Sequence, residues 1–272
     1  MVRKGLGQGV AYTLLSILLI ITLLPVALLL FLSVRSNLDI IMDFWAWPET
    51  IKWDNYTRAF EGIKDSILNT LFITAVSVTL GLLFGSFAGY SFARNRFPGK
   101  KILYMLLLTI IMIPGVLTLV PSYGLVVWLQ LTDSFWGLIL TYVAGAQVLI
   151  IVLVRNYVES IPEELFEAAR IDGGSEWYLY SRIAMPLAIP TLVSLGVLNF
   201  LAIYNDYIWP LLLLSQAKQT FAIAVVSLTT NGRADLGLTF AANVIGSIPL
   251  AIVMMLGMRY YVQGQLSGAI KN

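Results

Sequence analysis

Long apolar runs constrain this sequence more than any other feature. A helix needs about 18 or more apolar residues to cross the roughly 30 Å hydrocarbon core of a bilayer. Six segments reach or approach that length, at approximately 10–34, 67–93, 102–127, 135–154, 187–214 and 238–258. Of the 272 residues, 58% are hydrophobic and only 12% are charged, which is far from the balance of a soluble domain. The sequence therefore predicts an all-α integral membrane protein, a single domain over 1–272 with six transmembrane helices.

The distribution of positive charge predicts the orientation. The first apolar run follows Arg3 and Lys4 but is too long for the core of a signal peptide, so we interpret it as a retained span. Six spans place both termini on one side. That side, with loops 94–101 and 155–186, holds eleven Lys and Arg residues, against six on the other side. Both termini are therefore expected in the cytoplasm, and the outer segment 35–66, with its three Trp residues, is expected to cap the far face at the interface (Trp45, Trp47 and Trp53).

Glycine and proline mark special places in the spans. Three glycines recur every fourth residue in the second span, which is the small-residue spacing that lets helix backbones approach closely (Gly81, Gly85 and Gly89). We favour packing within the chain over an oligomer seam. Prolines in the third and sixth spans remove backbone donors and predict kinks there (Pro114, Pro121 and Pro249).

The residue inventory excludes several kinds of chemistry. Cys and His are absent, which rules out disulfides, thiol catalysis and Cys or His metal sites. No G-x-x-x-x-G-K-[ST] sequence occurs, and the segment FPGKK at 97–101 lacks its spacing. The basic residues form short clusters rather than the stripe expected of a nucleic-acid interface. No catalytic residue and no bound cofactor or metal are predicted, and any energy from ATP must come from a partner.

A polar insert at 156–186 separates the fourth and fifth spans. Ser160 and Glu163 have the spacing of a capping box, so a helix is expected from about residue 161. Gly173 and Gly174 should end it, because glycine readily adopts the left-handed conformation just past a last turn. A second short helix is expected over 175–184. The insert thus predicts a helix-turn-helix on the cytoplasmic side.

The first of these helices has two contrasting faces. One is narrow and apolar to small (Ile161, Leu165, Ala168, Ala169 and Asp172), and the opposite one is charged (Glu163, Glu167 and Arg170). This pattern indicates a docking element. The alternative is an amphipathic helix at the lipid interface. The narrow face without an aromatic anchor and the acidic opposite face argue against that alternative, since an anionic inner leaflet would not favour acidic residues.

At these residues the sequence resembles the permease subunits of ABC-transporter importers. Their cytoplasmic signature is EAA, three residues, Gly, nine residues, Ile, one residue, Leu-Pro. The spacing is matched here throughout, with Met185 in place of leucine (Glu167, Ala168, Ala169, Gly173, Ile183 and Pro186). Three further stretches, at 69–101, 204–214 and 259–272, resemble the second permease of the maltose-type carbohydrate importers, although the tail departs somewhat at 265–268 and at Asn272.

The resemblance implies a multi-subunit sugar importer in the prokaryotic cell (inner) membrane. A homologous permease, two cytoplasmic ATPase subunits that hold ATP and Mg, and an extracytoplasmic solute-binding protein would be its partners. The EAA helix would seat in the ATPase, so that closure on ATP moves the spans between inward-open and outward-open states. The tail is a second candidate contact with the ATPase (Gln263, Gly264 and Gly268).

A polar group inside the fifth apolar segment provides the candidates for a solute pathway (Tyr204, Asn205, Asp206, Tyr207 and Trp209). An intramembrane carboxylate is a functional candidate because its burial is costly unless it is satisfied. Carboxylate and amide oxygens can accept from sugar hydroxyls, and aromatic faces can cover a sugar ring. Equally, Asp206 could bond to a neighbouring helix or stabilise a break near Pro210. The resemblance implies that the partner permease holds most of the sugar contacts.

Two other classes of transporter compete with this interpretation. A stand-alone secondary transporter or channel could use Asp206 for ion coupling, although one carboxylate without histidine or an inverted repeat is a poor basis for it. An ABC permease for a non-sugar solute is disfavoured only by the 204–214 and tail stretches.

Overall fold

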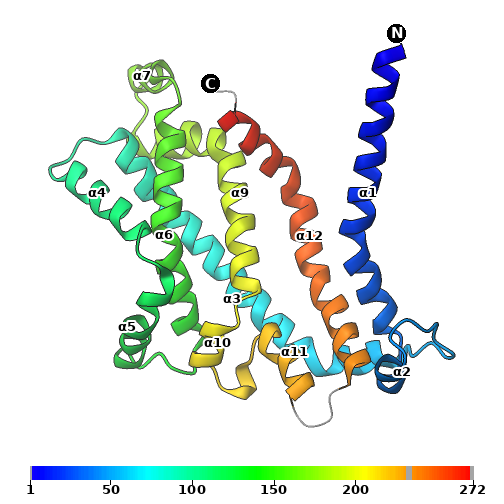
Figure 1. The fold of residues 1–272 in the computed structure, drawn as a ribbon. Coiled ribbons are helices and arrows are strands. Elements are labelled where there is room, and N and C mark those ends of the chain that lie inside the picture. The colour runs from blue at the N-terminus through cyan, green and yellow to red at the C-terminus, as the bar shows by residue number, and fades with distance from the viewer. Residues whose placement is uncertain (1, 231–234, 270–272) are drawn as a thin grey trace. The chain divides into compact units, whose positions relative to one another are not determined.

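The computed structural model is helical throughout the part of the chain that it describes (Figure 1). The backbone is described for residues 2–230 and 235–269, and the side chains for 11–229, 235–258 and 260. Five helical stretches there are long and apolar enough to cross a membrane: Ala11–Ser33, Asp54–Arg94, Phe135–Glu159, Glu176–Tyr204 and Leu236–Met258. They belong to α1 (Val2–Ser33), α3 (Asp54–Arg94), α6 (Phe135–Glu159), α8 with α9, and α12 (Leu236–Ala269). A bent pair of helices makes the count six if it is taken as one span.

That bent pair is the predicted third span. α4 (Lys100–Ile111) and α5 (Gly115–Trp128) meet at an angle of 106°. The break lies at Pro114, which precedes the first residue of α5 and has no backbone N–H with which to continue α4. A kink at Pro114 is confirmed. Pro121 and Pro249 lie inside the helices α5 and α12 and do not interrupt them.

The helix that carries the predicted fifth span, 187–214, starts earlier and ends earlier than that range. A single helical stretch begins with α8 (Glu176–Tyr178), passes through a π-helical turn (Leu179–Ala184) and continues as α9 (Met185–Tyr204). In the π turn the N–H of Met185 donates to the carbonyl of Tyr180, five residues back. This wider turn lets the helix pass Pro186 without a break. After α9 the chain leaves the helix at Asn205 and forms only the short α10 (Ile208–Leu213) and a 3-10 turn (Gln216–Lys218).

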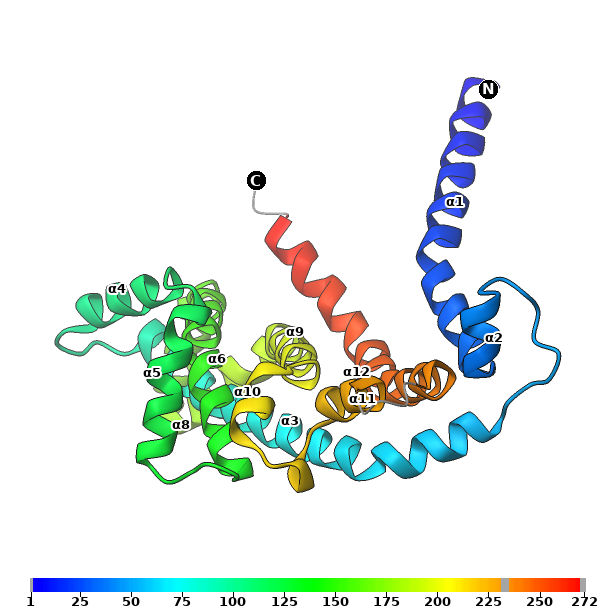
Figure 2. The ribbon, with the colours of Figure 1, turned by 60° about the horizontal axis from the view of Figure 1, so that its bottom comes forward.

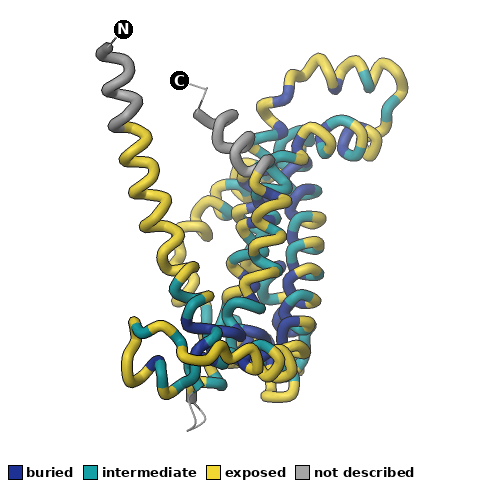
Figure 3. The backbone as a smooth tube through the Cα atoms, turned by 90° about the vertical axis from the view of Figure 1, so that its right-hand side faces the viewer, coloured by how far each residue is buried: buried dark blue, intermediate teal, exposed yellow. Residues whose placement is uncertain are grey.

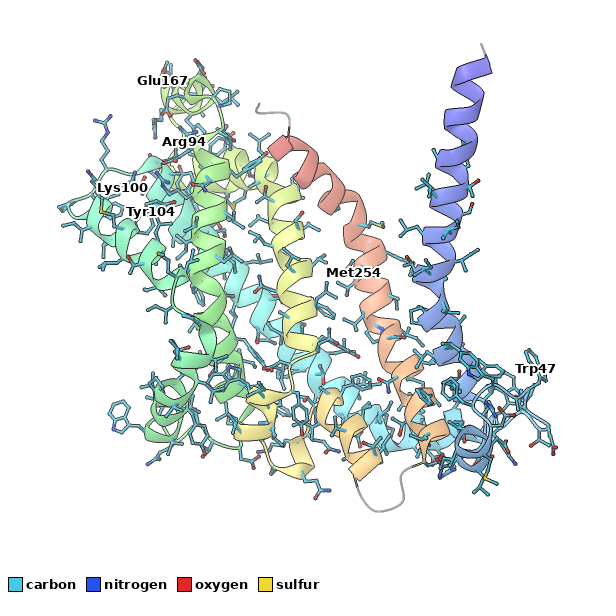
Figure 4. The ribbon with its side chains drawn as sticks, viewed as in Figure 1. Trp47, Arg94, Lys100, Tyr104, Glu167 and Met254 are labelled. Carbon is cyan, nitrogen blue, oxygen red and sulfur yellow. The ribbon has the colours of Figure 1, made fainter. Side chains whose placement is uncertain are left out.

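The chain divides into two compact units, and the first comprises residues 1–65 and 224–248. It contains α1, α2 (Asn37–Met42) and parts of α3, α11 (Phe221–Thr230) and α12. Residues 11–27 of α1 are exposed (Figure 3). At the end of α1, the buried Arg35 donates to the carbonyls of Asp39, Phe44 and Asp43 at 2.6–2.8 Å, which ties the 35–44 segment together. Trp45, Trp47 and Trp53 are exposed, as an interfacial cap requires, and Trp47 is labelled in Figure 4.

The second unit comprises residues 66–223 and 249–272 and is organised around α6. α4, α9 and α10 pack against this helix (Figures 1 and 2). α3 also meets it closely, at the predicted glycine positions: a Cβ on Gly85 would lie 2.5 Å from Ile150 Cγ2, and one on Gly89 would lie 2.8 Å from Val154 Cβ. The glycine spacing thus serves packing within the chain, as predicted.

Candidate functional site

The insert begins differently from the prediction. Ser160 is the C-terminal cap of α6, directly after Glu159. Its hydroxyl donates to the carbonyl of Tyr157 at 2.6 Å. α7 (Glu163–Ile171) begins after Pro162 without a side-chain cap. The predicted capping box of Ser160 and Glu163 is therefore wrong. The physical reason is competition, because the Glu163 carboxylate is engaged by Arg94 and Arg170 rather than by the amide of Ser160.

The end of α7 agrees with the prediction. Gly173 has a φ of +84°, the left-handed conformation, and its N–H donates to the carbonyl of Arg170 at 3.0 Å. The N–H of Gly174 donates to the carbonyl of Ala169 at 2.8 Å. A Cβ on Gly174 would lie 2.7 Å from that same carbonyl oxygen. The two glycines are thus required for different reasons, Gly173 for its backbone conformation and Gly174 for space.

Arg94, the last residue of α3, fixes the insert to the bundle. Its side chain is only 8% exposed and forms an ion pair with Glu163. The guanidinium donates to the carbonyls of Val158 and Ile161 at 2.8 and 2.6 Å. It also lies 4.0 Å from the centroid of the fully buried Phe166 ring, a cation–π contact. These groups, which we call the Arg94 joint, fix the corner between α6 and α7.

The polar network continues from the Arg94 joint along the insert and returns to α3. Glu163 also pairs with Arg170 at 3.3 Å, and Arg170 pairs with Glu176 at 3.4 Å. The hydroxyl of Tyr90, one turn before Arg94, donates to Glu176 at 3.0 Å. Partial burial by itself lowers the pKa of Arg170, but the two carboxylates outweigh that effect and raise it. Both helices of the insert are thus bonded to the same turn of α3.

The faces of α7 differ from the prediction in one important way. Phe166 is fully buried and provides the aromatic anchor that the pattern did not assign, while Leu165 is 48% exposed. Arg94 covers the ring of Phe166, so the inward face is set by a residue on another helix. Ile171, at 85% exposed, and Trp177, at 62%, project from the insert beside the exposed carboxylates. The outward surface is therefore acidic and apolar together.

The EAA residues occupy this outward surface or its edge. Glu167, Ala168, Gly173 and Pro186 are exposed, whereas Ala169 and Ile183 are half-buried. Glu167 lies at the tip of the insert (Figure 4). A hollow of 390 Å³ lies beside them, lined by Ala169, Asp172, Gly173, Gly174, Ser175 and Tyr178. The tail candidates Gln263, Gly264 and Gly268 belong to the last turns of α12, where side chains are outside the described residues.

The second candidate site surrounds the break between α9 and α10. Asp206 lies in this break and accepts a hydrogen bond from the Tyr142 hydroxyl at 2.7 Å. Its other oxygen accepts from the N–H of Ile208 at 3.0 Å. The carboxylate therefore bonds to α6 and starts α10, which is the structural role weighed against a solute role in the sequence.

A cavity of 910 Å³ opens beside Asp206. Of the five predicted pathway residues, the structure brings Asp206 and Trp209 to its wall. Tyr204 is fully buried against Phe200 and Phe221 at ring distances of 5.7 and 5.8 Å, Asn205 donates to the carbonyl of Leu201, and Tyr207 is not part of the wall. The wall also carries hydroxyl groups that the sequence did not single out (Thr118, Ser122 and Thr141).

The described residues thus form long apolar helices, a cavity whose wall carries a carboxylate, hydroxyls and an aromatic ring, and a separate charged insert. This arrangement suits solute passage rather than catalysis. The chain belongs to the family described as binding-protein-dependent transport system inner membrane component, whose model matches residues 81–266. It is a permease, a non-catalytic membrane subunit of an ABC transporter.

Curated relatives match over nearly the full chain. The multiple sugar-binding transport system permease protein MsmG of Streptococcus mutans is 32% identical over 96% of this chain and 96% of its own. The arabinooligosaccharides transport system permease protein AraQ of Halalkalibacterium halodurans is 31% identical over 88% of this chain and 85% of its own. The resemblance to carbohydrate-uptake permeases is confirmed, and the alternative of a stand-alone secondary transporter or channel is excluded.

Solved structures support the fold. A chain from a crystal structure of a bacterial ABC transporter involved in the import of alginate aligns with a TM-score of 0.80, covering 95% of this chain and 98% of that chain at 23% identity. A chain of the MetNI methionine ABC transporter aligns with a TM-score of 0.56 over 73% of this chain and 94% of that chain, at 19% identity.

Proposed function

We propose that this permease carries a sugar or sugar-like solute into the cell by alternating access. The names of its relatives, which include permeases for arabinooligosaccharides and multiple sugars, support this substrate class. The partners proposed are a homologous permease, two ATPase subunits that bind ATP and Mg, and an extracytoplasmic solute-binding protein. One solved transporter of the same fold was crystallised with a periplasmic protein bound to an alginate pentasaccharide, which supports the last of these.

The outward surface of the insert is where a cytoplasmic ATPase would bind. The Arg94 joint is the observation that carries this assignment, because a docking element must pass movement to the spans without bending at its base. Arg94 bonds the α6–α7 corner to α3 through two carbonyls, a carboxylate and an aromatic face. An amphipathic helix that only rested on lipid would not need such a fixed base. Glu167, Ala168, Ala169 and Gly173 are the contact residues proposed on α7, while Ile183 and Pro186 belong to the helix that follows.

Substitutions at the tip of the insert test this assignment. In the reconstituted transporter, Glu167→Lys should lower solute-stimulated ATP hydrolysis by about tenfold or more, since it reverses a charge at the contact. Gly173→Leu should have a similar effect, because a leucine is strained at the positive φ of this position. Arg58→Ala is the control, because the half-exposed Arg58 pairs only with Asp54 and Asp235 among the described residues, away from the insert. Normal stimulation in both insert variants would contradict the proposal.

The absence of cysteine makes direct crosslinking and orientation tests simple. Ala168→Cys places a unique thiol on the exposed face of α7, and Trp47→Cys places one at an exposed position between α2 and α3. With both termini inside, a membrane-impermeant maleimide should label the second variant in intact cells and the first only after the membrane is opened. Ala168→Cys should also crosslink to the ATPase. The reverse labelling pattern would overturn the proposed orientation.

The cavity beside Asp206 is the proposed solute pathway, with Asp206 and Trp209 as its contacts from this chain. Trp209→Ala should weaken transport several-fold without loss of assembly, since an aromatic face is the natural partner of a sugar ring. Tyr142→Phe removes the hydroxyl that donates to Asp206 and distinguishes a structural role of that carboxylate from a role in solute binding. If the role is mainly structural, this variant should reduce assembly of the complex. A binding panel of sugars, peptides and amino acids with the extracytoplasmic protein would decide between a sugar and a non-sugar solute.

A further inference from the structure

A second cavity, of 690 Å³, lies at the turn between α3 and α4 and has no part in the proposed transport path. Four basic residues line it: Arg96, Lys100, Lys101 and Arg155. Two aromatic residues, Phe97 and Tyr104, also line the cavity, and no carboxylate is among the lining residues. Lys100 and Tyr104 lie together at the start of α4 (Figure 4). The cavity therefore offers a concentrated positive potential.

This positive charge is only partly neutralised by the described residues of the chain. Arg155 pairs with Glu159 at 2.5 Å and lies 4.0 Å from the centroid of the Tyr104 ring. Its Nε atom is buried and has no hydrogen-bond partner there. The ammonium of Lys100 donates to the carbonyl of Asn95, while Arg96 and Lys101 are exposed and form no ion pair with described residues. One carboxylate thus faces four cations, and an anion would complete the site.

The surface next to the cavity shows what kind of anion fits. None of the twelve residues of α4 is buried. Its apolar side chains are widely exposed, among them Ile102 at 66%, Met105 at 52% and Leu106 at 54%. A soluble phosphate or nucleotide would satisfy the cations but would leave this apolar face without a partner. A ligand with an anionic head and long apolar chains would satisfy both.

We propose that this basic cavity binds an anionic phospholipid of the inner leaflet, with the phosphate among Arg96, Lys101 and Arg155 and the acyl chains along α4. The proposal rests on the orientation proposed above, in which the 94–101 loop is cytoplasmic. Anionic lipids are available on that side of the membrane and are attracted by clustered Lys and Arg. The cavity is also lined by Phe97 and Tyr104, and aromatic side chains are common at the level of the headgroups.

Because the cavity lies near the Arg94 joint in the sequence, a lipid bound there should also affect stimulation of ATP hydrolysis by solute. Arg96 follows Arg94 by two residues, and Arg155 lies on α6 about one turn before Val158, whose carbonyl Arg94 binds. A phosphate held by Arg96 and Arg155 would bridge α6 and the α3–α4 turn close to the Arg94 joint. Loss of the lipid should therefore weaken stimulation of ATP hydrolysis by solute, in addition to abolishing lipid retention.

The test uses the purified transporter complex with its full-length permease. Native mass spectrometry would count phosphatidylglycerol retained after exchange from vesicles of phosphatidylcholine and phosphatidylglycerol. Arg96→Gln with Lys101→Gln should lower the apparent affinity for phosphatidylglycerol by about thirtyfold, given the contribution expected of two interfacial cations. Lys52→Gln with Lys64→Gln removes the same charge from two exposed positions outside the cavity and is the matched control.

The outcomes separate the possible explanations. Selective loss of phosphatidylglycerol in the first double variant, with retention in the control, supports the site. Equal retention in both variants overturns it, and equal loss in both shows a non-specific charge effect, which also overturns it. Displacement of the lipid by millimolar inorganic phosphate would show a site for free phosphate instead, while occupation of this face by a partner subunit in crosslinking would show a protein contact. Because lipid retention is measured without transport, failure here leaves the proposed transport function untouched.

Discussion

The two ends of α6 are held by similar polar groups in different surroundings. At its C-terminal end, Arg94 binds the carbonyls of Val158 and Ile161 and pairs with Glu163. Before its N-terminal end, Lys218 binds the carbonyl of Asp133 and pairs with its carboxylate at 3.2 Å, while the N–H of Ser215 donates to the same carboxylate at 2.9 Å. We call this second group the Asp133 joint. Each joint thus combines a cation with a carboxylate and with backbone carbonyl groups, two at Arg94 and one at Lys218.

Burial separates the two joints. The Arg94 side chain is 8% exposed, whereas Lys218 and Asp133 are 44% and 50% exposed. Exposed ion pairs contribute little, because water and salt screen them. Removal of a nearly buried cation leaves carbonyls and a carboxylate without their partner, which costs considerably more. The comparison teaches that the insert end of α6 is held more strongly than the other end, where the loss of the polar contacts should cost little.

The largest effect is expected from Arg94→Ala. It removes the two carbonyl bonds, the ion pair and the contact with Phe166, and should cost about 2–3 kcal/mol of folding free energy, reduced from the fully buried case because Glu163 is half-exposed. Solute-stimulated ATP hydrolysis should fall by more than about tenfold. Thermal unfolding and ATPase assays of the same assembled complex measure both quantities. An intact response to solute would remove the distinction between the two joints.

Arg94→Lys should give an intermediate effect. Lysine keeps the charge near Glu163 but cannot serve two carbonyls and the Phe166 face with a planar fork of donors. Most of the folding free energy lost in Arg94→Ala should be recovered. Solute-stimulated ATP hydrolysis should remain several-fold below that of the unchanged chain. A lysine variant with full coupling would show that charge alone is sufficient at this position.

Asp133→Ala should have a smaller effect than either change at Arg94. It deletes the acceptor for Ser215 and Lys218, but both are exposed and can bond to water. The unfolding temperature should fall slightly and coupling should be unchanged. Lys218→Ala, measured beside it, should do less still, since Ser215 continues to bind the carboxylate.

The smallest effect is a pH dependence at the Asp133 joint. The N–H of Ser215 and then Lys218 hold the pKa of Asp133 below its usual value. Its stabilising contribution is therefore complete above the pKa of the unfolded chain, near about pH 4, and is lost as the pH falls through the lower folded pKa. The difference in unfolding temperature between the unchanged chain and Asp133→Ala should be constant near neutrality. In acid it should shrink to the part that does not titrate, which is the cost of alanine at the positive φ of 51° at this position. A difference that grows in acid would contradict this origin.

Much of the framework could be predicted from the sequence because lipid imposes simple rules. Apolar length located the long helices, and the spacing of Gly81, Gly85 and Gly89 predicted a close helix contact within the chain without naming α6 as the partner. The glycines at the end of α7 were also predictable, because the positive φ that ends a helix is a requirement of the local chain. The 106° bend was not, because a proline predicts a break but not the angle at which the packing resumes.

The Arg94 joint could not be predicted, since its parts are brought together by tertiary structure. Arg94 lies about seventy residues before Glu163, and local spacing assigned that glutamate to Ser160 instead. The same contact buries Phe166, which the helical pattern had left unassigned. A single large aromatic residue on an otherwise small-faced helix was the available signal.

The polar segment 204–209 shows the same limit. Composition grouped five residues, but the end of α9 at Tyr204 and the start of α10 at Ile208 separate their directions. Asp206 and Trp209 reach the cavity, while Tyr204 packs among aromatic rings. Helix breaks decide which polar side chains share a space, and the sequence indicated the break only through Pro210.

The π-helical turn at Leu179–Ala184 has a consequence for the whole stretch from Glu176 to Tyr204. A turn with five-residue spacing contains one residue more than an α-helical turn, so it offsets the angular phase on its two sides by about 100°. The segment with the exposed Trp177 and the segment α9 can therefore present their contact faces in different directions, although they form one continuous helix. Loss of a single residue within the turn would remove this offset and rotate one segment of the helix against the other.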